Sequence, residues 1–144
     1  PLMHRPVIVI CDDEPELVNE LAEWFEFQGW SVYKASNADE ALHLLRSKPT
    51  TCLVTDRLMP MLGGDALAQR VSALPASRRP RFVGVMTGDF SVQDHPRPGG
   101  VDMVFMKPVD PREILKAIVE RLRYRPPVVP KPWLSAAGMA SGSL

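Results

Sequence analysis

Four short apolar runs of the sequence each end at an ionic or hydroxyl side chain. In chain order, these side chains are Asp12 with Asp13, Asp56, Thr87 and Lys107. Carboxylates that are brought together repel one another, and a proton or a cation must relieve that repulsion. Aspartates without histidine or cysteine favour Mg²⁺, which takes oxygen ligands and keeps several waters, over zinc. The pattern therefore predicts a magnesium site at Asp12, Asp13 and Asp56.

Lys107 and Thr87 add what phosphoryl transfer requires. That reaction depends on charge neutralisation and alignment more than on covalent chemistry from the protein. A metal ion, an ammonium and a hydroxyl donor placed around one point would surround the transferred group. Asp56 stands alone at the end of its run, so we interpret it as the nucleophile.

Five β-branched runs would position these residues. They alternate with segments whose apolar residues recur at helical spacing, which predicts an α/β fold with a parallel sheet and helices on both faces. The runs are Val7–Cys11, Ser31–Ala35, Cys52–Thr55, Phe82–Met86 and Met103–Met106. A single aspartate after a strand is typical of a turn or a helix cap. Because parallel strands end at one edge of a sheet, the convergence of four such ends favours a ligand site there.

Capping and stop signals predict the helices. The first starts near Pro15 and stops at Gly29, the second runs from its cap Asn37 to before Pro49, the third spans Asp65 to Leu74, and the last runs from its cap Asp110 to Pro126. Prolines and glycines crowd the segment from Phe90 to Gly100, so the fourth of five possible helices should be short or irregular. The outer face of the first helix is acidic, which is typical of a solvated surface and less often of a partner site; it carries Glu16, Glu20, Glu23 and Glu26.

Composition sets further limits. The chain has 144 residues, 45% hydrophobic and 24% charged, which fits one globular domain. Seventeen basic residues balance seventeen acidic ones, so we expect no general attraction to nucleic acid, and the strand-sized apolar runs predict no membrane span.

Cys11 and Cys52 should lie about 10 Å apart along neighbouring strands, too far for a disulfide, which fits a reduced, cytoplasmic setting. Residues 1–124 are expected to form the domain, and residues 125–144 a proline-rich linker or flexible tail.

The sequence resembles the receiver domain of bacterial two-component response regulators from about Val7 to Arg123. The matching pieces are VIVICDDEP, CLVTDRLMPMLGG, FVGVMTGD and VFMKPVD. The resemblance implies a flavodoxin-like, doubly wound five-stranded sheet in the order 2-1-3-4-5. It also implies that Asp56 accepts a phosphoryl group from a sensor histidine kinase or a histidine phosphotransfer protein.

The resemblance assigns roles to the other residues as well. Asp13 would bind Mg²⁺ directly, Asp12 mainly through water, and the backbone carbonyl of Leu58 would be a further ligand. Lys107 would hold a phosphoryl oxygen, and Thr87 would move toward the acyl phosphate. A cis peptide bond would precede Pro108.

Two features depart from the family pattern. Val104 stands where an aromatic switch residue is usual, and its neighbour Phe105 should point to the opposite face, into the core. We expect the segment from Phe90 to Gly100 to be the mobile element instead. Leu58 and Asp89 would border the path of water to the acyl phosphate. The Leu58 side chain is either a shield against hydrolysis or an exposed loop leucine.

Two other functions share some of these residues. One alternative is a Mg²⁺-dependent phosphohydrolase with an aspartate nucleophile, but that class places D-x-D after the first strand, and here Glu14 follows Asp12 by two residues. Another is an interaction scaffold that is never phosphorylated, which would have no need of Asp56, Thr87 and Lys107 together. We therefore expect a signalling domain that catalyses only its own phosphorylation and dephosphorylation, with a C-terminal output domain beyond this chain as a further possible partner.

Overall fold

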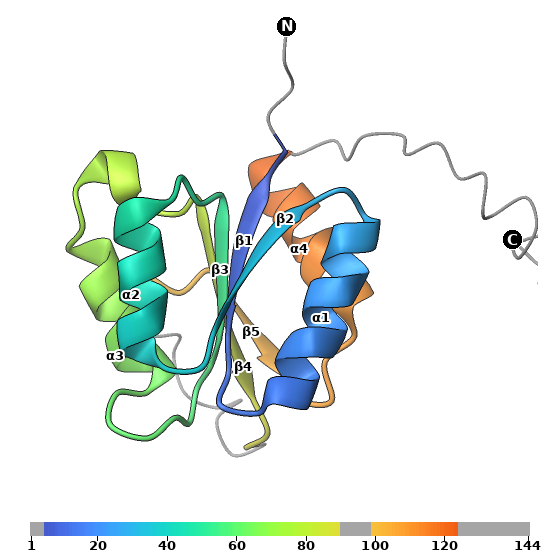
Figure 1. The fold of residues 1–144 in the computed structure, drawn as a ribbon, viewed down its shortest axis with the longest axis horizontal. Coiled ribbons are helices and arrows are strands. Elements are labelled where there is room, and N and C mark those ends of the chain that lie inside the picture. The colour runs from blue at the N-terminus through green and yellow to red at the C-terminus, as the bar shows by residue number, and fades with distance from the viewer. Residues whose placement is uncertain (1–4, 90–98, 124–144) are drawn as a thin grey trace, which may run out of the picture.

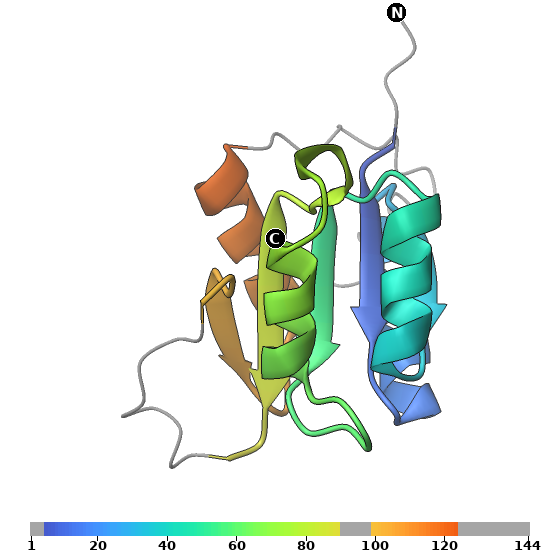
Figure 2. The same cartoon turned by 90° about the vertical axis from the view of Figure 1, so that its left-hand side faces the viewer.

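The computed structural model describes residues 5–89 and 99–123. Its strands are β1 (Val7–Cys11), β2 (Ser31–Ala35), β3 (Cys52–Asp56), β4 (Phe82–Thr87) and β5 (Met103–Met106). They form one parallel sheet in the order β2-β1-β3-β4-β5, and their carboxyl ends share one edge (Figure 2). The predicted doubly wound fold and strand order are confirmed.

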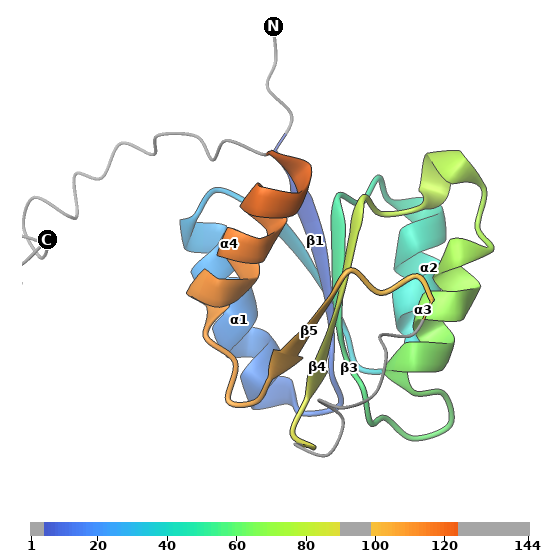
Figure 3. The same cartoon turned by 180° about the vertical axis from the view of Figure 1, so that it is seen from behind.

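The helices cover the two faces of the sheet in pairs. α1 (Pro15–Phe27) and α4 (Pro111–Leu122) pack on one face, and α2 (Ala38–Ser47) and α3 (Gly64–Ser72) pack on the other (Figures 1 and 3). Each pair closes its own hydrophobic core against the strands. Two covered faces explain why the central strands are apolar at nearly every position.

The predicted caps form. The side chain of Asn37 accepts a hydrogen bond from the backbone N–H of Glu40 at 2.9 Å, and that of Asp110 accepts one from the N–H of Arg112 at 2.9 Å. These bonds satisfy N–H groups that the first turn of a helix leaves unpaired. Both α2 and α4 therefore begin where the side-chain chemistry predicts.

Some boundaries differ from the prediction. The third helix ends at Ser72, and a short 3₁₀ turn at Ala76–Arg78 follows it that the sequence did not predict. α4 ends at Leu122 because Arg123 adopts a left-handed conformation (φ 52°), so the helix stops before the prolines. Most of the segment from Phe90 to Gly100, and all of 124–144, lie outside the described residues. The irregular fourth helix and the domain boundary at 124 stay predictions.

The two cysteines lie as expected. Cys52 pairs with Ile8, three residues before Cys11, which places the thiols about 10 Å apart along the strand direction. Both are buried and free. Among the described residues, no helix combines the length and the apolar character needed to cross a bilayer.

Candidate functional site

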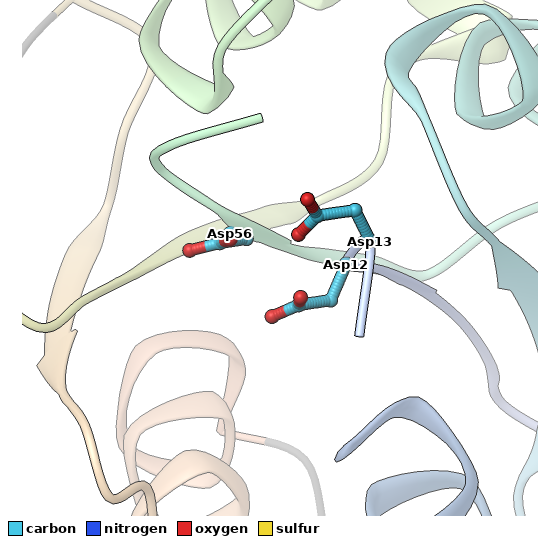
Figure 4. Close-up of side chains that lie close together, drawn as sticks. All are labelled: Asp12, Asp13 and Asp56. Atoms are coloured by element: carbon cyan, nitrogen blue, oxygen red, sulfur yellow. The ribbon is translucent and has the colours of Figure 1, made fainter. Parts of the chain in front are cut away.

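The ends of β1 and β3 bring three carboxylates together. One oxygen from each of Asp12, Asp13 and Asp56 lies within 4.8 Å of the other two. Asp12 is 1% exposed and Asp56 is 6% exposed, whereas Asp13 is exposed. Figure 4 shows Asp13 extending toward the side of the sheet that carries α2 and α3, with Asp12 on the opposite side. The predicted cluster is therefore real and opens to solvent through Asp13.

Asp12 is fixed by the backbone around it. Its N–H donates to the carbonyl of Ala35 at 3.1 Å and so extends the pairing of β1 with β2 by one residue. Its Oδ1 accepts a hydrogen bond from the N–H of Glu14 at 2.9 Å. The second carboxylate oxygen, Oδ2, remains directed at Lys107.

Lys107 joins the first and third strand ends. Its Nζ lies 3.0 Å from Asp12 Oδ2 and 3.2 Å from Asp56 Oδ1, and 3.9 Å from Glu14. Its backbone N–H donates to the carbonyl of Thr87 at 2.8 Å, which holds the end of β5 beside β4. The peptide bond from Lys107 to Pro108 is cis, as expected. The sequence prediction that Lys107 and Asp56 meet is confirmed.

The electrostatics of this contact perturb both groups. Burial, and next the repulsion from Asp12, raise the pKa of Asp56 above its ordinary value, although Lys107 and the Leu58 amide lower it in part. Burial lowers the pKa of Lys107, but its hydrogen bonds to Asp12 and Asp56 outweigh that effect and raise the pKa. The Lys107 ammonium therefore stays charged at neutral pH, and Lys107 alone does not offset the burial of Asp56 and its repulsion from Asp12.

Thr87 ends β4 next to the acceptor strand. Asp56 pairs with Met86, so Thr87 lies one residue beyond it on the adjacent strand. The side chain is buried, and its Oγ1 accepts a hydrogen bond from the backbone N–H of Asp89 at 3.1 Å. Thr87 is thus at the predicted edge, with its hydroxyl engaged by the loop that follows.

The loop after Asp56 is closed by two glycines whose role the sequence analysis missed. The N–H of Gly64 donates to the carbonyl of Arg57 at 2.9 Å. A Cβ on Gly64 would collide with the carbonyl oxygen of Asp56, and one on Gly63 would lie 2.7 Å from that of Arg57. The adjacent glycines before a helix were the available signal. Leu58, on this loop, is 73% exposed, and its effect on hydrolysis of the acyl phosphate stays a prediction.

Phe105 and Val104 face opposite sides of β5. Phe105 is buried in the core beneath α1 and α4, and Val104 packs against the core beneath α2 and α3. The ring of Phe105 fills the space beside Gly84, where an added Cβ would lie 2.7 Å from it. The expectation that Phe105 is a core residue is confirmed.

The charge of the site matches a divalent cation. Three carboxylates converge with one ammonium, which leaves two negative charges without a partner at the cluster itself. All the converging ligand atoms are oxygens, and one carboxylate is open to solvent. Such a donor set can hold Mg²⁺ together with water or phosphate oxygens.

Sequence comparison agrees with this chemistry. The chain matches the family model described as "Response regulator receiver domain" over residues 8–119. The chain belongs to this family. It is also 31% identical over 122 residues to a protein of Leptolyngbya boryana described as "Uncharacterized 14.6 kDa protein in sodA1 3'region", covering 83% of this chain and 92% of that one.

Two further relatives place this receiver domain in context. The transcriptional regulatory protein SrrA of Staphylococcus aureus is 25% identical over 116 residues, covering 81% of this chain but 47% of SrrA, so the chain spans about half of that relative. The crystal structure of a response regulator receiver domain protein (CheY-like) from Methanospirillum hungatei JF-1 has a TM-score of 0.73. It is 27% identical, and the match covers 83% of this chain and 95% of that one. The chain is thus a receiver domain of response regulators.

Proposed function

We propose that Asp56 is the phosphoacceptor of this receiver domain and takes its phosphoryl group from a phosphohistidine. One observation carries the proposal: a buried carboxylate lies between a lysine ammonium at 3.2 Å and two further carboxylates at the strand ends. A charged carboxylate is a competent nucleophile, and the surrounding groups match those that phosphoryl transfer requires. The donor would be a sensor histidine kinase or a histidine phosphotransfer protein.

The transfer exchanges one bond for another. An oxygen of Asp56 forms the new bond to phosphorus while the phosphorus–nitrogen bond of the donor breaks. The electron pair of the broken bond stays with the imidazole, which takes a proton from solvent. Lys107 stays charged throughout and would donate a hydrogen bond to an oxygen of the arriving group.

The residues present fit a magnesium ion. Asp13, Asp56 and the backbone carbonyl of Leu58 would hold it, and Asp12 would act mainly through a bound water. When bound, Mg²⁺ supplies positive charge that neutralises the phosphoryl oxygens. The Thr87 hydroxyl, whose oxygen accepts from Asp89 N–H, would donate its own O–H to the phosphoryl group, and this new bond at the start of the following loop would begin the conformational signal.

A groove lies beside Lys107, which contacts the acceptor. A groove of about 520 Å³ between the start of α1 and the turn after β5 is lined by Glu14, Leu17, Lys107 and Val109 among others. Because Lys107 borders this groove and also contacts Asp56, we propose that a protein donor docks there, beside the acceptor. SrrA is named a transcriptional regulator and is about twice as long as the matched region. A linked output domain is therefore part of the proposal, and a cytoplasmic location stays a prediction.

Incubation with Mg²⁺ and acetyl phosphate tests the assignment directly. Intact mass should rise by one phosphoryl group, peptide mapping should place it on Asp56, and both should vanish in Asp56→Asn or on chelation of the metal. Asp13→Ala should lose Mg²⁺ binding in a calorimetric titration. Asp39→Asn, which removes an exposed carboxylate from the first turn of α2, is the matched control and should behave as wild type. Modification that persists in Asp56→Asn would overturn the assignment.

A further inference from the structure

Arg57 is a second cation beside the acceptor, and it is held away from the carboxylate cluster. It follows Asp56 directly, so the two Cα atoms are about 3.8 Å apart. Its guanidinium nevertheless pairs with Asp65 Oδ2 at 2.9 Å, in the first turn of α3. The backbone of Arg57 is fixed independently, because its N–H donates to Met86 at 2.8 Å and its carbonyl accepts from Gly64 at 2.9 Å.

An unrestrained guanidinium at this position would be drawn to the cluster. Asp13 is the exposed member of the cluster and forms no ion pair within residues 5–89 and 99–123. It extends toward the face of the sheet that carries α3, where Arg57 finds its partner (Figure 4). An arginine matches a carboxylate with two parallel hydrogen bonds, so Asp13 would be a good alternative partner.

The surroundings of Asp65 favour its ion pair with Arg57. One of its carboxylate oxygens contacts Arg57, and the other is buried without a hydrogen-bond partner among the described residues. A partly buried carboxylate in that position depends on a single cation for its stabilisation. Its place in the first turn of α3 adds a favourable interaction with the helix dipole.

We propose that Asp65 is a positioning residue that sequesters the Arg57 guanidinium and so leaves Asp13 free to bind the divalent cation. The inference rests on the proposed function, because it assumes that the cluster binds Mg²⁺. Under this proposal, the two cations near Asp56 have different roles. Lys107 stays at the cluster on Asp12 and Asp56, and Arg57 is kept out of it.

Mg²⁺ affinity without any phosphoryl donor tests the proposal. Asp65→Asn should raise the Mg²⁺ dissociation constant by about fivefold, the size of one released exposed ion pair, when titrated calorimetrically at 0.15 M salt. Arg57→Gln combined with Asp65→Asn should return it to within about twofold of wild type. The Nε–H signal of Arg57 in nitrogen-15 NMR should move in Asp65→Asn and move again when Mg²⁺ displaces the guanidinium from Asp13.

Two controls separate sequestration from its alternatives. Asp39→Asn removes the same charge from the first turn of α2 without releasing a cation, so it should leave the affinity nearly unchanged. Arg57→Gln alone should bind Mg²⁺ at least as tightly as wild type. If the ion pair were purely structural, this variant would bind Mg²⁺ more weakly. The Arg57→Gln variant therefore tests the proposal even if Asp65→Asn folds poorly. The proposal is overturned by wild-type affinity in Asp65→Asn, by equal weakening in the single and double variants, or by equal weakening in Asp39→Asn. Absence of Mg²⁺ binding in the wild type would instead refute the proposed function.

Discussion

Lys107→Met removes the only ammonium that reaches the carboxylate cluster among the described residues, while keeping most of the length of the side chain. In the wild type, Nζ lies 3.0 Å from Asp12, whose side chain is fully buried, and 3.2 Å from Asp56, whose side chain is 9% exposed. Without the ammonium, both carboxylates stay buried with no cation in contact. The variant should therefore be less stable, and electrostatics should dominate the loss.

The expected loss follows from those two contacts. A hydrogen bond to a charged group contributes about 1.5–3 kcal/mol, so the two together would give roughly 3–6 kcal/mol. The lysine side chain is 21% exposed, and solvent weakens both interactions. We therefore expect the free energy of unfolding of the metal-free protein to fall by about 2–4 kcal/mol at pH 7.5.

Urea denaturation over a range of pH and Mg²⁺ concentration measures this effect. Acid protonates Asp56, whose pKa is raised by burial, and removes its need for a cation, so the loss should shrink as the pH falls toward 4. Millimolar Mg²⁺ should also reduce the difference, because it supplies positive charge to the same cluster. A loss of the same size at every pH and every Mg²⁺ concentration would show that lost packing, and not charge, explains the variant, and would refute the reasoning.

Three other variants test separate parts of the structure. Asp56→Asn should raise the free energy of unfolding of the metal-free protein at neutral pH, because burial raises the pKa of Asp56 and so makes its charged form costly in the folded state. The gain should fade as the pH drops toward about 3.9, the pKa of an aspartate in the unfolded chain. A gain that grows in acid would contradict the raised pKa of Asp56. Gly64→Ala should lower the free energy of unfolding, measured by urea denaturation, by about 1–3 kcal/mol and should slow labelling by acetyl phosphate, because the added Cβ meets the Asp56 carbonyl oxygen. Gly88→Ala is the control, because nothing lies within 4 Å of a Cβ added there. Equal effects in the two variants would exclude the steric cause. Glu26→Gln should raise the free energy of unfolding by about 0.3–1 kcal/mol in thermal unfolding, because Glu26 places a negative charge in the last turn of α1, where no basic residue offsets it. No change would show that solvent screens the helix dipole at that end.

The strands and their shared edge could be predicted because the determining interactions are local or periodic. Continuous β-branched runs imply strands that are buried on both faces, and βα repeats have one favoured handedness. Once the strands are parallel, Asp12, Asp56, Thr87 and Lys107 must meet at the same edge. The caps of α2 and α4 were predictable for a related reason, since Asn37 and Asp110 bind N–H groups within three residues of themselves.

The remaining features depend on distances between segments that sequence spacing does not define. The end of α4 was placed too late because Arg123 turns left-handed before the prolines are reached. The close approach of Gly64 to Asp56 depends on how the loop folds back on its own strand. Likewise, the ion pair between Arg57 and Asp65 depends on where α3 begins, which no pattern in the acceptor motif indicates.

The construction of the site also explains why it is poised for a cation. Asp12 and Lys107 are 95 residues apart in sequence, and three carboxylates converge only when the sheet has formed. Folding therefore creates a repulsion that the unfolded chain does not have, and a single lysine relieves only part of it. A cation that binds this cluster binds the folded state alone and must stabilise it in proportion to its occupancy. Binding of a divalent cation would thus offset part of the free energy that the fold loses when it gathers these charges.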